Sequence, residues 1–275
     1  MTVVTQTVVI QDGRLRPDGK VALDADDPAL VRGLAVFETL RSWEGRVSHL
    51  ELHLDRLQGS AAALDLPMPE RALLRAEVKR AVALLGEEAA VRITLTAGGS
   101  RIVRASPLPA PLLQARCASR RHPDHPWLTG RAKHISRAAW VVAVREAGTD
   151  EVLWVDGEGL LLEGTWSNVF AVRDGSLYTP ADDGRILPGI TRQTVLTAAR
   201  ALGLPHQEGP TPAAGPWDEL YLSSSLKILC PIVELDGRPA LGMGPVGRRL
   251  VAAYEATLRR SGDAAGPGAP ASRPR

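Results

Sequence analysis

Amine chemistry is the first possibility that the residue types suggest, because lysine is rare in this chain. Among 33 basic residues, lysine occurs only as Lys20, Lys79, Lys133 and Lys227. Arginine can replace lysine as a surface charge but cannot form an imine, since its guanidinium stays protonated and delocalised. Lys20 falls in an expected turn and Lys79 on the polar side of an expected helix. Lys133 and Lys227 are therefore the candidates for a reactive amine.

Two segments could bind a phosphate group. Gly189-Ile190-Thr191 begins an expected helix directly after a proline, and the free N–H groups at a helix start attract an anion. Ser224 and Ser225 follow an expected strand and offer hydroxyl and backbone donors. A plain helix cap and a plain turn are the alternative interpretations of these segments.

Arg56 and Glu163 carry charges whose positions suggest specific partners. His53 and Arg56 are three residues apart on an expected helix and share one face. That face could be solvated, or the Arg56 guanidinium could hold a phosphate. Glu163 ends the apolar run Leu160-Leu161-Leu162 and should be at least partly buried, so it needs a partner. The partner could be a structural cation or the ring nitrogen of a cofactor.

An α+β arrangement must position these side chains. Periodicity and turn signals predict strands in the first half at residues 3–10, 15–23 and 91–95, a hairpin of 35–42 with 46–48, and helices at 50–64 and 70–85. In the second half they predict helices at 135–147, 190–202 and 246–259, and strands at 152–155, 160–163, 169–172, 176–178, 220–223 and 228–233.

Composition divides the chain into two domains and a tail. A polar segment broken by Pro123 and Pro126 suggests a linker at 119–130, between a small N-terminal domain at 1–118 and a larger domain at 131–260. The Gly/Ala/Pro-rich segment 261–275 is expected to be disordered.

Bulk properties exclude several classes of function. The net charge of +2 and the lack of a dense Lys/Arg run argue against nucleic acid as a partner. No apolar run reaches the roughly 18 residues of a membrane span, and no signal peptide is recognisable. Two distant cysteines fit a reducing, cytoplasmic location. His122 and His125 lack a clear third ligand, so we expect no metal site.

Six motifs together resemble the class IV aminotransferase family, which comprises the fold-type IV pyridoxal-5′-phosphate (PLP) enzymes. The matching stretches are Arg32-Gly33 with Phe37-Glu38-Thr39-Leu40-Arg41, His53-Leu54-Asp55-Arg56-Leu57, Lys133-His134-Ile135-Ser136-Arg137, Glu163-Gly164-Thr165-Trp166-Ser167-Asn168, Leu187-Pro188-Gly189-Ile190-Thr191-Arg192, and Leu220-Tyr221-Leu222-Ser223-Ser224-Ser225. The resemblance covers roughly residues 5–258. It implies the two-domain α+β fold of D-amino acid aminotransferases.

The resemblance also implies a role for each matching residue. Lys133 would hold PLP as a Schiff base, Glu163 would pair with the pyridine nitrogen, and Arg56 would bind the phosphate. Further cofactor contacts would come from Ile190, Thr191, Ser224 and Ser225, and substrate contacts from Phe37, Thr39, Arg41, Arg101 and Arg137. The substrate would be a small amino compound, and the working unit a homodimer. Lys227 has no counterpart in the family, and we interpret it as structural or as a charge on the substrate side.

The family contains both aminotransferases and a lyase. Lys133-His134-Ile135-Ser136-Arg137 is similar to the lysine-histidine-x-x-arginine stretch of 4-amino-4-deoxychorismate lyases, which form 4-aminobenzoate and pyruvate for folate synthesis. The loop Gly98-Gly99-Ser100-Arg101 matches the lyase pattern only in part. The sequence favours the lyase over an aminotransferase acting on branched-chain or D-amino acids with 2-oxoglutarate. The third alternative is an inactive, non-enzymatic homologue, against which the presence of Lys133 and Glu163 argues.

Overall fold

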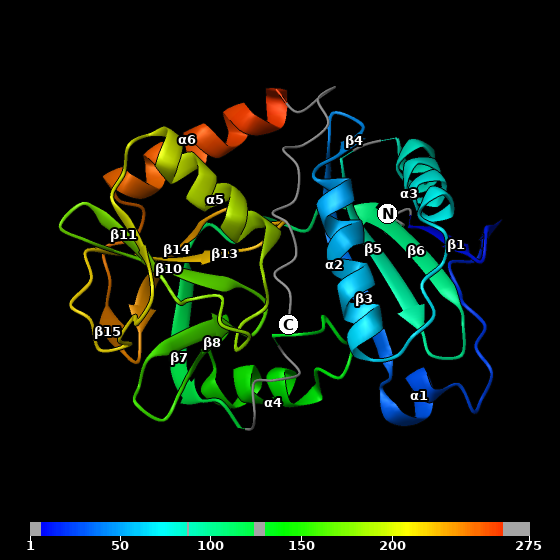
Figure 1. Cartoon of the computed structure of the whole chain (residues 1–275), viewed down its shortest axis with the longest axis horizontal. Helices are drawn as coiled ribbons and strands as arrows, with labels where there is room; N and C mark the ends of the chain where they lie inside the picture. Colours follow the sequence, from blue (N-terminus) through cyan, green and yellow to red (C-terminus); the bar gives the residue numbers. More distant parts are fainter. Residues whose placement is uncertain (1–6, 87, 124–129, 261–275) are drawn as a thin grey trace, which may run out of the picture.

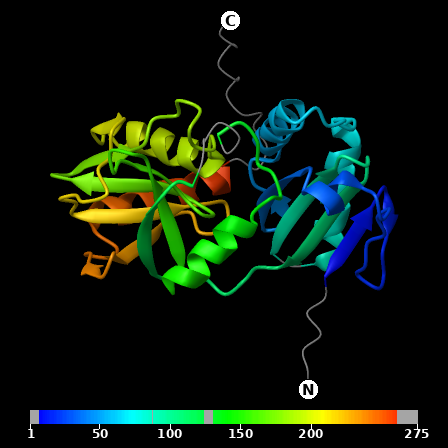
Figure 2. The same cartoon turned by 90° about the horizontal axis from the view of Figure 1, so that it is seen from below.

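The computed structural model describes residues 7–86, 88–123 and 130–260, which form two bodies side by side, each built on one β-sheet (Figure 1, Figure 2). The first body contains strands β1 (Val8–Gln11), β2 (Arg14–Leu15), β3 (Ala35–Trp43), β4 (Arg46–Val47), β5 (Ala89–Thr96) and β6 (Arg101–Pro107), and helices α1 (Pro28–Arg32), α2 (Leu50–Ala63) and α3 (Arg71–Leu85). Its strands form an antiparallel sheet in the order β2-β1-β6-β5-β3-β4.

Helices α2 and α3 cover one face of this sheet, and their apolar residues form one core with the strands. Strand β3 alternates strictly between the two faces, as a pleated strand must. Val36 and Leu40 are buried in the core beneath the helices. Phe37, Thr39 and Arg41 are partly exposed and therefore point to the uncovered face, where they line a cavity.

The second body contains a nine-stranded mixed sheet with helices on its outer sides. Its elements are β7 (Ala115–Arg121), α4 (Ala138–Ala147), β8 (Glu151–Val155), β9 (Leu161–Gly164), β10 (Asn168–Arg173), β11 (Ser176–Thr179), α5 (Ile190–Ala201), β12 (His206–Glu208), β13 (Glu219–Ser223), β14 (Cys230–Leu235), β15 (Arg238–Pro239) and α6 (Pro245–Arg260). The strand order is β12-β11-β10-β13-β14-β7-β8-β9, with β15 beside β14. One core lies under α5 and α6, and another under α4 on the other side of the body (Figure 1).

Most predicted elements are confirmed, with local corrections. The strand predicted at 15–23 is wrong beyond β2, because the chain around Pro17 and Gly19 forms turns. The helix predicted from residue 135 begins at Ala138, since Ile135 N donates to Ala35 O (3.0 Å) and extends the pairing with β3. The prediction for residues 3–6 lies outside the described residues. Helix α1 and strands β6, β7, β12 and β15 were not predicted.

The domain boundary at residue 118 stays a prediction. Strand β7 pairs in parallel with β14 and with β8, so residues 119–121, expected in a linker, belong to the second sheet. The chain passes from the first sheet to the second between β6 and β7, over residues 108–114. The rest of the expected linker lies largely outside the described residues, as does the tail 261–275.

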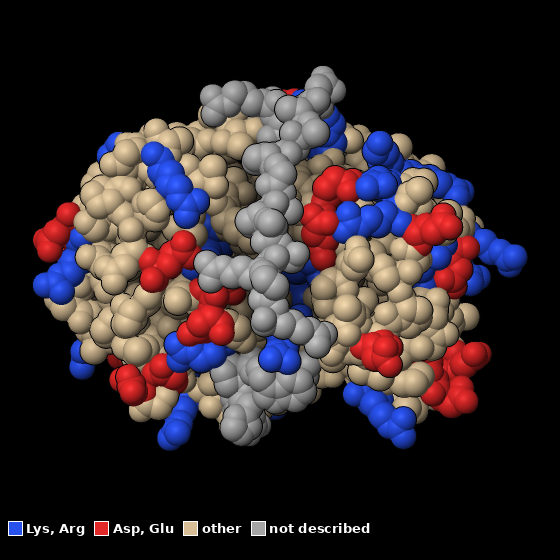
Figure 3. All heavy atoms as spheres, in the orientation of Figure 1, with Lys and Arg blue, Asp and Glu red and all other residues tan. Residues whose placement is uncertain are grey.

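Basic and acidic side chains are interspersed on the face shown in Figure 3, most densely over the body that carries α2 and α3. There Arg71 pairs with Asp55, and Arg75 with Glu51, across the two helices. Such exposed pairs contribute little to stability. Among the described helices, none is long and apolar enough to cross a membrane.

Candidate active site

A cavity of about 710 Å³ is lined by residues of both bodies, a volume within the usual range of small-molecule sites. Every residue that the sequence suggested as catalytic, cofactor-binding or substrate-binding lines it, except Arg101. The cavity wall is rich in cations, with Arg41, Arg56, Arg92, Lys133, Arg137 and Lys227 against Glu163 and Glu255. This charge balance suits an anionic ligand.

Lys133 lies on a segment that the first sheet holds in place. Phe37 N donates to Lys133 O (2.8 Å), and Lys133 N donates to Ser60 Oγ (3.0 Å). The Lys133 Nζ atom lies 5.0 Å from the centroid of the Phe37 ring. Burial and the nearby Arg56 guanidinium lower the pKa of Lys133 to about 7. The neutral amine, which is the nucleophilic form, is therefore well populated near neutral pH.

Glu163 is a buried acid at the end of β9. Its Oε2 atom accepts a hydrogen bond from Leu187 N (2.9 Å), which fixes the orientation of the carboxyl group. Burial raises the pKa of Glu163 to about 7. A buried carboxyl of this kind can share a proton with a ring nitrogen in the cavity.

Arg56 is oriented by a buried cluster on the helix side of β3. Its Nε and Nη2 atoms donate to the two oxygens of Glu38 at 2.7 Å each, and its Nη1 atom donates to Pro188 O (3.0 Å). His53 Nδ1 lies 2.7 Å from Glu38 Oε2. Burial favours the neutral acid, but Arg56 and His53 hold the pKa of Glu38 below its usual value. The guanidinium is thus fixed between the first body and the segment before α5.

The start of helix α5 supplies free backbone donors. Gly189 is the N-cap of this helix, and no side chain in the described part of the chain caps the helix N-terminus. A Cβ atom at Gly189 would lie 1.8 Å from Asn168 Oδ1, so the close approach requires glycine. Asn168 Nδ2 in turn donates to Leu187 O (3.0 Å). Ile190 and Thr191 follow as the first helical residues, where an anion is favoured.

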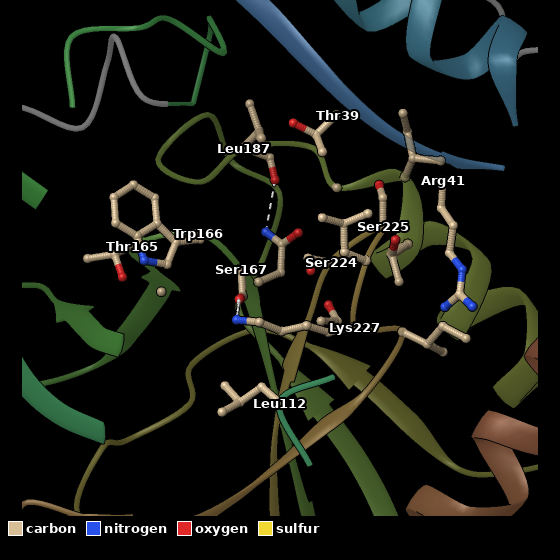
Figure 4. Close-up of a pocket in the computed structure, with 18 of the residues that line it drawn as sticks. Thr39, Arg41, Leu112, Thr165, Trp166, Ser167, Leu187, Ser224, Ser225 and Lys227 are labelled. Atoms are coloured by element: carbon tan, nitrogen blue, oxygen red, sulfur yellow. Dashed lines mark hydrogen bonds between the residues drawn. The ribbon is translucent and has the colours of Figure 1, made fainter. Parts of the chain in front are cut away.

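Ser224 and Ser225 face the same end of the cavity from the turn after β13 (Figure 4). Ser225 Oγ lies 3.5 Å from His53 Nε2 of the first body. Two further hydroxyls that line the cavity, Ser223 Oγ and Thr165 Oγ1, are buried without a hydrogen-bond partner among the described residues. Buried hydroxyls normally have partners, so both are available to a bound ligand.

Arg92 is a cavity residue that the sequence analysis missed. Its guanidinium carbon lies 3.7 Å from the centroid of the Phe37 ring, and it forms no ion pair with a carboxylate among the described residues. Burial lowers the pKa of Arg92. The sequence did contain a signal for this position. Arg92 lies between the apolar Val91 and Ile93 in a strand, so its side chain is on the opposite face of the sheet from theirs.

Arg137 and Arg101, both expected on the substrate side, have different surroundings. Arg137 lines the cavity with its guanidinium carbon 5.1 Å from the centroid of the Trp140 ring, and its Nε donates to His134 O (3.2 Å). Arg101 does not line the cavity of this chain, so the structure does not bring it together with the other suggested substrate residues. Both of its donors Nε and Nη2 bind Glu77 of α3, at 2.7 and 2.8 Å.

These side chains fit pyridoxal phosphate. An amine, a buried acid and an arginine beside a helix start match the aldehyde, ring nitrogen and phosphate of that cofactor, and the hydroxyls without partners add further donors. When bound, the cofactor supplies an electron sink for a carbanion of the substrate. The fold and this site therefore define a pyridoxal phosphate enzyme.

Comparison with known proteins identifies the family. The family model described as Amino-transferase class IV matches residues 35–235. A bifunctional aminodeoxychorismate lyase / D-amino acid transaminase from Mycobacterium tuberculosis (strain ATCC 25618 / H37Rv) is 34% identical over 265 residues, which cover 84% of this chain and 92% of that protein. The chain belongs to the class IV aminotransferase family.

Solved structures agree with this assignment. A fold IV-transaminase from Curtobacterium pusillum superposes with a TM-score of 0.84 at 28% identity, covering 93% of this chain and 99% of that chain. The PLP-bound form of a hypothetical aminotransferase from Mycobacterium tuberculosis gives a TM-score of 0.84 at 30% identity, covering 93% and 100%. The predictions of the fold class and of PLP as cofactor are confirmed.

The pKa of Lys133 predicts an unusual pH dependence for the cofactor-free protein. The rate at which Lys133 reacts with an amine-directed reagent should reach half its maximum near pH 7, because its pKa is lowered to about 7. An ordinary lysine reaches that point near pH 10.4. Peptide mapping after labelling at a series of pH values measures the curve. A half-maximum near pH 10 at Lys133 would contradict the prediction.

Proposed function

We propose that the enzyme is a 4-amino-4-deoxychorismate lyase that forms 4-aminobenzoate and pyruvate in folate synthesis. The observation that carries the proposal is the position of Arg137, a residue of the lyase-like stretch after Lys133, in the cavity wall. Arg92 lines the same cavity from the first body, and neither arginine pairs with a carboxylate among the described residues. Two such cations suit a substrate with two carboxylates, as aminodeoxychorismate has.

In the proposed reaction, each group of cavity residues has its own role. Lys133 Nζ would hold the cofactor, and its amine, once free, would accept the proton from the substrate carbon that bears the amino group. Glu163 keeps a proton at the ring nitrogen. Arg56, with Ile190, Thr191 and the two serines, holds the phosphate. The bond between the ring carbon and the enolpyruvyl oxygen would then break. The group would leave as enolpyruvate, which takes up a proton to become pyruvate. The ring that remains is aromatic, which favours the lyase outcome over return of the proton.

Amino transfer is the second candidate, and the relative's name includes both activities. The two reactions use Lys133, Glu163 and the phosphate site alike, so these residues do not distinguish them. The difference must arise from the groups around the substrate, which include Phe37, Thr39 and Arg41.

A pair of assays on the purified enzyme tests the choice. We expect 4-aminobenzoate from aminodeoxychorismate, and weak or no glutamate formation from 2-oxoglutarate with D-alanine or L-leucine. Lys133→Ala serves as the blank in both assays. Robust amino transfer without 4-aminobenzoate would overturn the lyase proposal and leave the cofactor site unaffected.

We also propose that the working unit is a cytoplasmic homodimer in which the neighbouring subunit completes each site. Sedimentation of the active enzyme should give twice the mass of the 29.4 kDa chain. The measurement is made at the protein concentration of the activity assay, because dimers dissociate on dilution. A fully active preparation that sediments as one chain would refute the dimer.

A further inference from the structure

Lys227, whose role the family resemblance leaves open, is held in a buried cluster at the cavity wall. Its Nζ atom donates to Glu151 Oε1 and lies 3.4 Å from Ser167 Oγ, toward which its side chain points (Figure 4). Glu151 is fully buried and also accepts from Ser167 Oγ (2.6 Å) and Trp166 N (3.2 Å). Because a buried carboxylate needs a partner, Lys227 is the counter-ion that Glu151 requires.

Lys227 belongs to a turn with an unfavourable backbone. Lys227 N and Ile228 N both donate to Ser224 O, at 3.1 and 2.9 Å. Ile228 has φ 57°, in the left-handed region that a β-branched residue rarely adopts. Such a conformation persists only where the surroundings hold it. The same turn carries Ser224 and Ser225 into the cavity.

Glu151 connects this turn to the segment of the ring-nitrogen acid. A Cβ atom at Gly164 would lie 2.5 Å from Glu151 Oε2, so the backbone directly after Glu163 packs against this carboxylate. The bonds from Trp166 and Ser167 fix the residues that follow. Glu151 thus contacts one cofactor segment directly and the other through Lys227.

We propose that Lys227 and Glu151 are positioning residues for the cofactor. Their ion pair fixes the turn 224–228 against the segment 163–167, so that Ser224 and Ser225 face the cofactor at the required place. The inference rests on the assignment of these serines to the cofactor site, and it is independent of the choice between lyase and aminotransferase. The competing role for Lys227 is direct attraction of a bound anion by its charge.

The effect of Glu151→Gln separates the two roles. Trp166 N and Ser167 Oγ donate to different oxygens of Glu151. Glutamine keeps one of these acceptors in its carbonyl oxygen, turns its amide group toward the other partner and removes the counter-charge of Lys227. If Lys227 acts through the pair, Glu151→Gln weakens cofactor binding just as Lys227→Met does. If Lys227 attracts the anion itself, Glu151→Gln leaves binding unchanged or strengthens it, because the ammonium is no longer neutralised.

The experiment measures PLP affinity of the holoenzyme, without substrate, from the visible absorption retained after serial dilution. We expect about a tenfold loss of PLP affinity in Lys227→Met and in Glu151→Gln. The double variant should lose no more affinity than the more affected of the two single variants, because the two residues act as one unit. Lys227→Arg should recover most of the affinity. Lys79→Met, a change at an exposed lysine of α3, is the matched control and should match the parent enzyme.

Three outcomes overturn the proposal: unchanged affinity in Lys227→Met, unchanged or tighter binding in Glu151→Gln, or fully additive losses in the double variant. At saturating PLP, the single variants should keep kcat within about threefold of the parent, since the pair acts on the cofactor's place and not on proton transfer. If Glu151→Gln does not fold, Ser167→Ala replaces it, with a smaller loss expected. Unchanged PLP affinity in Ser167→Ala would then contradict the proposed role of the Lys227–Glu151 pair.

Discussion

Lys133→Ala is expected to abolish turnover, with a loss of at least about 10⁴-fold, because one side chain supplies both the covalent attachment and the proton transfer. The fold should persist, since the backbone bonds of Lys133 to Phe37 and Ser60 do not need its side chain. The purified variant is compared with the parent in both activity assays and in thermal unfolding. Lys79→Ala, at an exposed position, is the matched control.

Borohydride reduction of the parent enzyme identifies the attachment site directly. Peptide mapping should place the pyridoxyl group on Lys133, whose pKa near 7 provides the neutral amine that imine formation with PLP needs. Lys227 is the alternative amine in the cavity, but its Nζ atom donates to Glu151 and Ser167. A label on Lys227 would refute the assignment of Lys133.

Glu163→Gln is expected to reduce kcat by about 10²–10⁴-fold, because an unprotonated pyridine ring is a poor electron sink. Glutamine has nearly the same volume and can still accept the hydrogen bond from Leu187 N, so stability should change little. The exposed Glu158→Gln is the control for the loss of one carboxylate. Near-normal turnover in Glu163→Gln, with PLP bound, would contradict the role.

The site residues that a local pattern indicated, and that line the cavity, are those whose neighbours lie close along the chain. The helix start at Ile190 follows directly from Pro188-Gly189, and Glu163 ends a recognisable apolar run. The structure brings both to the cavity with Lys133. Their assigned roles remain proposals that the variants above test.

The contacts that the sequence did not indicate join residues that are distant along the chain. Glu151 and Lys227 are 76 residues apart, and neither position alone indicates an ion pair. Arg101 follows a glycine loop that suggested a substrate contact, but Glu77, on a separate helix, determines where its guanidinium lies. No local pattern could have shown that contact.

Strands β6 and β7 were missed for a similar reason. Their sequences carry arginines and serines among the apolar residues, as in Arg101-Ile102-Val103-Arg104 and in Ser119-Arg120-Arg121. Their strand state comes from neighbours in the sheet, since β7 lies between β14 and β8 in the second body. Tertiary context often overrides intrinsic strand propensity in this way.

The chain enters the second body at β7 and then returns to the first sheet before α4, where residues 133–135 pair with β3. A recombination event with one crossover between β6 and β7 would join the first body of one relative to the second body of another. It would place the Lys133 segment of one ancestor against the β3 edge of the other. A functional chimaera within the family therefore needs parents in which the Lys133 segment of one can pair with strand β3 of the other. In gene shuffling, residues 35–37 and 133–135 should come from the same parent.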